Sequence, residues 1–150
     1  MVRSLQDVSP VQCFGCGAHN THGFRIKSFW DGDELLCTWQ PEPYHIGHPG
    51  YVYGGIIASV VDCHSIWTAI AHYCRDNNQS LDDGRLPAAY VTAALKVNYL
   101  KPVPIEGKME LRARPLEKSE RKTVVGCRVF HSGIECANAE VVAVRVQGRP

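Results

Sequence analysis

The sequence predicts an α+β fold, in which an antiparallel sheet of five to six strands curls around one long central helix. The first observation is a run of about twenty residues after Gly54 and Gly55 without proline or further glycine, enough for five to six helical turns. The second is that most of the remaining chain alternates between apolar and polar residues or breaks at turn signals, as strands do. Two strands, one helix and then four strands can bury the helix against a single sheet.

The predicted helix, residues 54–74, is apolar on nearly every face, which is typical of a helix that is buried in a core or a membrane. It carries Asp62, His64, Ser65 and His72, and only Arg75 marks its end. A membrane-spanning helix tolerates few polar side chains and is often flanked by basic clusters. We therefore expect a core helix and no membrane partner. A single carboxylate in such a helix is costly unless it has partners or a function.

Two strands are expected before the helix, at residues 24–30 and 34–40, joined by the hairpin sequence Asp31-Gly32-Asp33. Residues 44–52 form a loop rich in His, Gly and Pro that leads directly into the helix. Loops that deliver the chain to the start of a buried helix often carry function.

Four strands are expected after the helix, separated by turn signals. A polar segment, residues 75–87, comes first and is expected to be an exposed loop. The expected strands are residues 90–100, 108–116, 123–131 and 134–146. In the first of them, strict alternation places four residues on one face: Ala93, Leu95, Val97 and Tyr99.

Length and composition indicate one domain covering residues 1–150. A formal net charge of +1 gives no field that would favour nucleic acid or anionic lipid. The first residues lack the apolar segment of a secretion signal, and the seven cysteines are then expected to be reduced thiols. These observations predict a cytoplasmic protein that does not bind nucleic acid.

A possible zinc motif lies near the start, where Cys13, Cys16, His19 and His22 follow one another at intervals of three. The histidine pair is closer than the usual spacing between zinc ligands. The alternative is a glycine-rich turn with buried thiols, since a free cysteine often packs as a small apolar residue. We favour the turn and expect no metal at these four residues.

Three stretches resemble the hot-dog fold of acyl-CoA thioesterases, in the branch of the phenylacetate-pathway and human thioesterase-superfamily proteins. They are Cys13-Phe14-Gly15-Cys16-Gly17 with Asn20 and Gly23; the segment from His45 to Gly55, followed by Asp62; and the segment from Val91 to Pro102. The middle stretch is the most specific. The resemblance covers about residues 13–146.

The resemblance implies roles for individual residues. Asp62 corresponds to the catalytic carboxylate, the N–H of Gly54 to the group that binds the thioester carbonyl oxygen, and Thr92 to an assisting hydroxyl. Further candidates for substrate binding are Tyr53, Gly55, Asn20, His45 and Ser65. The family has histidine where this chain has Tyr53, a departure that affects the site itself.

We therefore expect a homodimer or homotetramer that hydrolyses a small or medium acyl thioester of coenzyme A or acyl carrier protein, without a cofactor. The main alternative is a non-catalytic acyl-thioester binding protein on the same fold, which Tyr53 favours. A hydratase of this fold is a third reading, but no histidine here lies in a matching motif.

Overall fold

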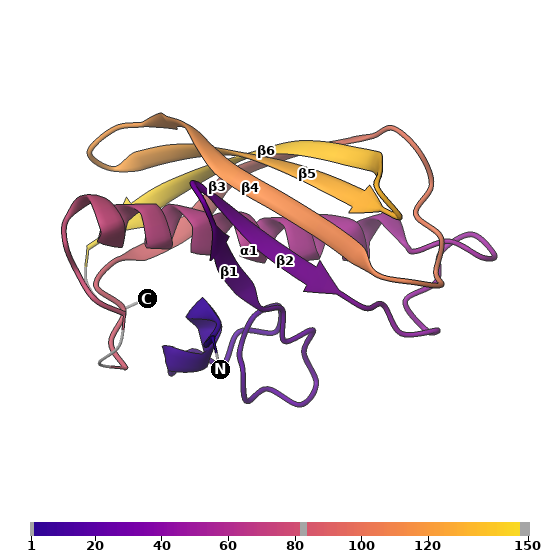
Figure 1. The fold of residues 1–150 in the computed structure, drawn as a ribbon, viewed down its shortest axis with the longest axis horizontal. Coiled ribbons are helices and arrows are strands. Elements are labelled where there is room, and N and C mark those ends of the chain that lie inside the picture. The colour runs from indigo at the N-terminus through magenta and orange to yellow at the C-terminus, as the bar shows by residue number, and fades with distance from the viewer. Residues whose placement is uncertain (1, 82–83, 148–150) are drawn as a thin grey trace.

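The computed structural model describes residues 2–81 and 84–147, so Asp82 and Asp83 of the expected exposed loop lie outside the described residues. A six-stranded antiparallel sheet curls around one long helix, which confirms the expected fold class (Figure 1). The elements are the 3-10 helix η1 (Leu5–Val8), strands β1 (Ser28–Asp31) and β2 (Glu34–Trp39), helix α1 (Gly54–Asp76), and strands β3 (Ala89–Tyr99), β4 (Met109–Lys118), β5 (Lys122–His131) and β6 (Ile134–Val146).

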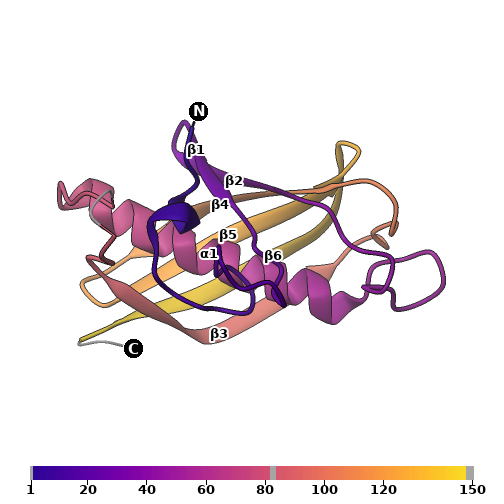
Figure 2. The ribbon, with the colours of Figure 1, turned by 90° about the horizontal axis from the view of Figure 1, so that it is seen from below.

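The strand order is β1-β2-β4-β5-β6-β3, so the chain crosses the sheet through α1 and places β3 at one edge and β1 at the other. Every neighbouring pair is antiparallel. Seen from below, α1 runs along the inner face of the sheet, and β3 follows its length at the near edge (Figure 2). The strand after the helix therefore lies alongside that helix.

Helix α1 provides the centre of the core. By length and composition it is apolar enough to cross a membrane, but 56% of its most apolar window is buried inside the protein. Val60, Val61, Trp67 and Ile70 of α1 are all buried, and they pack in one cluster with the inward residues of the strands. The apolar character of α1 is thus explained by burial against its own sheet.

Alternation in β4 follows the sequence expectation. Met109, Leu111 and Ala113 are buried while the residues between them are more exposed. Such a period of two marks a strand with one face on the core.

A buried hydrogen-bond network fixes η1 and the first hairpin onto α1. The Gln6 amide donates to Ser28 Oγ at 2.9 Å and accepts from the Ser28 N–H at 2.7 Å. Ser28 Oγ contacts His64 Nδ1 at 2.8 Å, and His64 Nε2 lies 3.1 Å from the carbonyl oxygen of Leu35. Because a carbonyl can only accept, His64 must carry its proton on Nε2 and accept from Ser28 through Nδ1. His64 is therefore a structural residue.

Strict alternation was wrong for the first half of β3. Thr92 pairs with Ala143 and Ala94 pairs with Val142 of β6, so Ala93 is an extra residue in a β-bulge. A bulge shifts the facing of side chains by one position. Strict alternation places Thr92 and Tyr99 on different faces of the strand. Because of the bulge, Thr92 instead points to α1, as Tyr99 does.

Candidate active site

Asp62 and Thr92 meet where α1 passes under the edge strand. Thr92 Oγ1 donates a hydrogen bond of 2.5 Å to Asp62 Oδ1. Asp62 is half-buried and Thr92 is exposed, so the carboxylate is oriented by a partner and still reaches solvent. Among the described residues, Oδ2 has no hydrogen-bond partner. A carboxylate fixed through one oxygen, with the other available, is suited to act as a base or nucleophile.

The start of α1 presents free backbone donors. Tyr53 is the N-cap residue, and its carbonyl oxygen accepts the N–H groups of Ile56 and Ile57 at 3.0 and 3.3 Å. The N–H groups of Gly54 and Gly55 come before these first bonds of the helix, where no intrahelical acceptor exists. Together with the positive end of the helix dipole, they can bind a carbonyl oxygen that becomes negative during a reaction.

Tyr99 of β3 fixes this helix start, and the sequence analysis did not assign it to the site. Its hydroxyl donates to the carbonyl oxygen of Gly54 at 2.7 Å. Burial, and to a lesser degree the neighbouring Tyr53, raises the pKa of Tyr99, so its phenol remains a donor. Tyr99 is seven residues beyond Thr92 on the same strand. Strict alternation places the two on opposite faces, so no local signal in the sequence linked Tyr99 to the site.

Tyr53 lies at the N-terminal end of α1. Its side chain is 58% exposed, and its ring lies across Gly55, where an added Cβ would be 2.5 Å from Tyr53 Cε1. The Tyr53 ring thus occupies the space that a side chain at position 55 would fill. The Tyr53 N–H donates to the carbonyl oxygen of His45 at 2.9 Å, which holds the entry of the helix.

A hollow of about 480 Å³ opens at this end of α1. Tyr51, Tyr53, Gly54, Tyr99 and Lys101 are among the residues that line it. Its volume lies in the range of about 300–1,000 Å³ that is common for small-molecule sites. It combines aromatic walls, one cation and the free backbone donors of the helix start.

Among the described residues, the other three candidates form no hydrogen bond with Asp62. The His45 ring contacts Phe24, Trp39 and Tyr44, and burial lowers its pKa; it supports the loop that carries Tyr53. Asn20 bonds to the carbonyl of Gln12 and the N–H of His22, and so shapes the N-terminal turn. The structure places Ser65 in the core, where it is completely buried, and it lines none of the hollows described here.

Asp62 and Gly54 of one chain do not converge. They are eight residues apart on the same helix, which corresponds to about 12 Å along its axis. Each is bonded to a different part of β3, Asp62 through Thr92 and Gly54 through Tyr99. The structure thus brings the predicted catalytic residues to the edge strand in two separate pairs.

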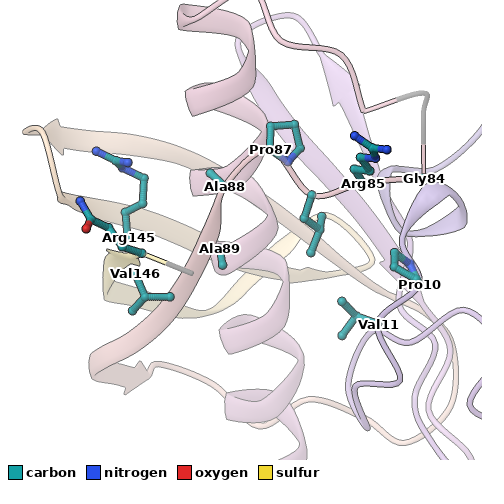
Figure 3. A pocket seen from close by; sticks show the side chains of 11 residues that line it. Pro10, Val11, Gly84, Arg85, Pro87, Ala88, Ala89, Arg145 and Val146 are labelled. Carbon is teal, nitrogen blue, oxygen red and sulfur yellow. The ribbon is translucent and has the colours of Figure 1, made fainter. Parts of the chain in front are cut away.

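A larger hollow of about 970 Å³ lies between the N-terminal loop and the beginning of β3 (Figure 3). Pro10 and Val11 form one side, and Ala88, Ala89 and Val146 face them. Its lining includes no residue of α1. The chemistry that Asp62 and Gly54 can perform is therefore not located in this hollow.

The cysteines of the possible zinc motif do not gather with its histidines. His19 and His22 are both exposed, whereas Cys13 and Cys16 lie beside Cys63 of α1. Cys63, next to Asp62 in sequence, points toward this N-terminal turn.

The fold and the family match place the chain in the thioesterase class. The thioesterase superfamily model matches residues 49–137, more than half of the chain, and the chain belongs to this superfamily. The match includes Tyr53, Gly54, Gly55, Asp62, Thr92 and Tyr99.

Individual relatives carry more specific names. The chain is 30% identical over 128 residues to the acyl-coenzyme A thioesterase THEM4 of Xenopus laevis, covering 83% of this chain and 51% of that protein. It is 22% identical over 147 residues to THEM4 of Rattus norvegicus, covering 97% and 57%. The chain thus spans about half the length of the curated relatives it matches.

Solved structures agree with the fold. A thioesterase superfamily protein from Shewanella loihica PV-4 superposes with a TM-score of 0.67 at 36% identity, covering 84% of this chain and 95% of that chain. The Escherichia coli PaaI protein of the phenylacetic acid degradation operon gives a TM-score of 0.67 at 13% identity, covering 83% and 82%. At 13% identity, the similarity to PaaI concerns the fold alone.

Proposed function

We propose that this protein hydrolyses acyl-CoA thioesters with a small or medium acyl group, or the same group on acyl carrier protein, and that Asp62 is its catalytic carboxylate. One observation carries this proposal: the hydrogen bond that orients the half-buried Asp62 through Thr92. The acyl-CoA thioesterase names of the relatives support the substrate class.

The reaction needs a group to deliver oxygen to the thioester carbon and donors for the resulting oxyanion. As a general base, Asp62 removes a proton from a water molecule that attacks the carbonyl carbon. The C–S bond then breaks, and the departing sulfur takes up the proton to leave free thiol and carboxylic acid. As a nucleophile, Asp62 would form an acyl anhydride that water hydrolyses to the same products. In both routes the Gly54 N–H binds the carbonyl oxygen.

We infer that two subunits complete the site. Strand β3 is an edge strand whose residues 91–96 are all exposed, and it carries exposed Val91, Leu95 and Tyr99. An exposed apolar edge strand invites pairing with another chain. A homodimer built through β3 would cover this edge.

The contacts along β3 suggest the register of such a dimer. Residues directly opposite each other in an antiparallel pair lie on the same face of the sheet, and Ala93 is the extra residue of the bulge. With the two-fold axis at Lys96, Thr92 therefore lies opposite the partner subunit's Tyr99. Because Thr92 holds Asp62 and Tyr99 holds Gly54, Asp62 would then approach the partner subunit's Gly54. In this arrangement, Asp62 and the Gly54 N–H that acts with it come from different subunits. Their distance along one helix therefore no longer keeps them from acting on the same substrate.

The second candidate function is binding of an acyl thioester without hydrolysis. The observation that favours it is Tyr53, whose ring lies over Gly55 at the helix start. A tyrosine phenol does not take the place of histidine as a proton-transfer group at neutral pH.

Thiol release from a panel of acyl-CoA substrates of increasing chain length tests the proposal, with binding of a non-hydrolysable acyl-CoA thioether measured in parallel. We expect turnover on at least one small or medium acyl-CoA. Tight thioether binding without turnover of any substrate would establish the binding protein instead. Neither binding nor turnover would contradict both functions.

A further inference from the structure

Three cysteine sulfurs gather at the junction of the N-terminal turn and α1. The Sγ atoms of Cys13, Cys16 and Cys63 all lie within 4.8 Å of one another, and those of Cys13 and Cys63 are 3.7 Å apart. Cys16 is buried, while the other two are half-buried. The thioesterase site uses none of these side chains.

The turn around Cys13 directs backbone donors toward sulfur. The Gly15 N–H donates to Cys13 Sγ at 3.3 Å, and the Gly17 N–H donates to the Cys13 carbonyl oxygen at 2.8 Å. The first bond favours a negatively charged sulfur, because hydrogen bonds to a charged form stabilise it. The second closes the turn and brings Cys16 back beside Cys13.

The absence of a side chain at Gly15 allows the third sulfur to approach. A Cβ on Gly15 would lie 2.3 Å from Cys63 Sγ, so the sulfur could not keep this position beside a larger residue. The sulfur of Cys63 thus fills the place that a side chain of the turn would occupy. A larger residue at position 15 would displace the Cys63 sulfur from the cluster.

We propose that Cys13, Cys16 and Cys63 bind one Zn²⁺ ion, with a water molecule in the fourth position. Zinc binds thiolates at about 2.3 Å in a tetrahedral arrangement, which places neighbouring sulfurs about 3.8 Å apart. The observed 3.7 Å between Cys13 and Cys63 fits that geometry. A ligand set made only of sulfur favours zinc over magnesium or calcium.

This site differs from the one that the sequence spacing suggested. The motif Cys13, Cys16, His19 and His22 offered four ligands, but the third ligand comes from α1, 47 residues after Cys16. The proposal departs from the expectation that Cys13 and Cys16 bind no metal, because Cys63 supplies a ligand that the four-residue motif does not contain. Because Cys63 directly follows Asp62, the ion would tie the N-terminal turn to the helix beside the proposed catalytic residue.

The test is a metal titration of the whole chain, reduced and stripped with a chelator. We expect one Co²⁺ per chain, with the sulfur-to-metal charge-transfer absorption and intense visible bands of tetrahedral cobalt thiolate, and displacement of Co²⁺ by Zn²⁺. In the unaltered protein, Zn²⁺ should also slow alkylation of the peptides that carry Cys13, Cys16 and Cys63. The alkylation experiment requires no variant.

Cys63→Ser should weaken Co²⁺ binding by about 100-fold or more, since loss of even an outer-shell partner costs about 10–100-fold. Cys74→Ser is the matched control, because Cys74 is a cysteine of the same helix outside the cluster. This control and the His19→Ala/His22→Ala double variant should bind as the unaltered protein does. Circular dichroism confirms that each variant is folded.

Three results would overturn the proposal. One is the absence of the charge-transfer band in the reduced, unaltered protein. Another is unchanged binding by Cys63→Ser. The third is a Cys13–Cys63 disulfide that forms in air in a protein whose reduced form takes up no metal. The outcome is independent of thioesterase activity, so failure of either proposal can be distinguished from failure of the other.

Discussion

The hydroxyl of Thr92 lies 2.5 Å from Oδ1 of Asp62, and it reaches the carboxylate because the strand bulges at Ala93. Without the bulge, Thr92 would face away from α1. The backbone of β3 thus determines how the carboxylate is held. The bulge is therefore a feature of the candidate site as well as of the sheet, as bulges next to active sites often are.

Replacing Thr92 tests this hydrogen bond. Thr92→Val removes the donor and keeps the shape, and we expect kcat/KM for the best acyl-CoA to fall by about 10-fold or more, since a hydrogen bond to a charged group contributes about 1.5–3 kcal/mol. Thr92→Ser, which keeps the hydroxyl, is the control and should retain most of the activity. Equal activity of the Val variant and the unaltered protein would show that Asp62 does not need this partner.

Tyr53 is expected to donate a hydrogen bond or form a wall, and not to transfer protons. Tyr53→Phe should therefore lower kcat/KM modestly, by the equivalent of about 0.5–1.5 kcal/mol. Tyr53→His should be tolerated, since the resembling family carries histidine there. Both values are measured by thiol release. A loss of activity in Tyr53→Phe as large as that caused by removing the Asp62 carboxylate would make the phenol central to the chemistry.

The proposed dimer predicts a specific effect of charge on the edge strand. Leu95 is an apolar residue of β3, 38% exposed, and Leu95→Arg would place a charge at the centre of the proposed interface. We expect this variant to sediment as a monomer and to lose activity. Ile134→Arg is the matched control at the start of β6, where Ile134 is 52% exposed, and it should remain a dimer. An active monomer in the Leu95→Arg variant would contradict a site shared between subunits.

The buried His64 predicts how stability depends on pH. Burial lowers the pKa of His64 to about 4, below the value of about 6.5 in the unfolded chain. Between these values the unfolded chain binds more protons than the folded protein, so the free energy of unfolding decreases as pH falls. The loss through this window should be on the order of 3 kcal/mol from His64. Burial also lowers the pKa of His72, which adds a loss in the same direction.

Urea unfolding at several pH values between 7 and 4 measures this loss. His64→Gln should flatten the pH dependence, although it lowers stability at pH 7. His19→Ala alters an exposed histidine and should leave the profile unchanged. An unchanged slope in His64→Gln would show that other groups control the acid sensitivity.

The sequence predicted the fold class because its signals were strong and local. The apolar run of α1 and the alternation of Met109, Leu111 and Ala113 in β4 each fix one element. The bulge at Ala93 was missed because a small apolar residue among others gives no local sign of an extra position in the strand. Alternation alone therefore assigned Thr92 to the wrong face.

The candidate site was predictable only where residues are neighbours in sequence or carry a family motif. Asp62, Gly54 and Thr92 came from the resemblance, and the structure adds the hydrogen bond between two of them. Tyr99 was missed as a site residue, since its bond to Gly54 joins positions 45 residues apart. Cys63 was missed as a neighbour of Cys13 for the same reason, because that contact depends on how the N-terminal turn packs against α1.

The Asp62 carboxylate is proposed to perform the chemistry, and Asp62→Asn tests this role most directly. Asparagine has the same shape but cannot act as base or nucleophile, so thiol release from the best acyl-CoA should fall by at least about 100-fold. The thermal midpoint should change little. Asp76→Asn is the matched control at the far end of α1, where Asp76 pairs with Lys118, and it should keep its activity. Retention of most of the rate in folded Asp62→Asn would contradict the account.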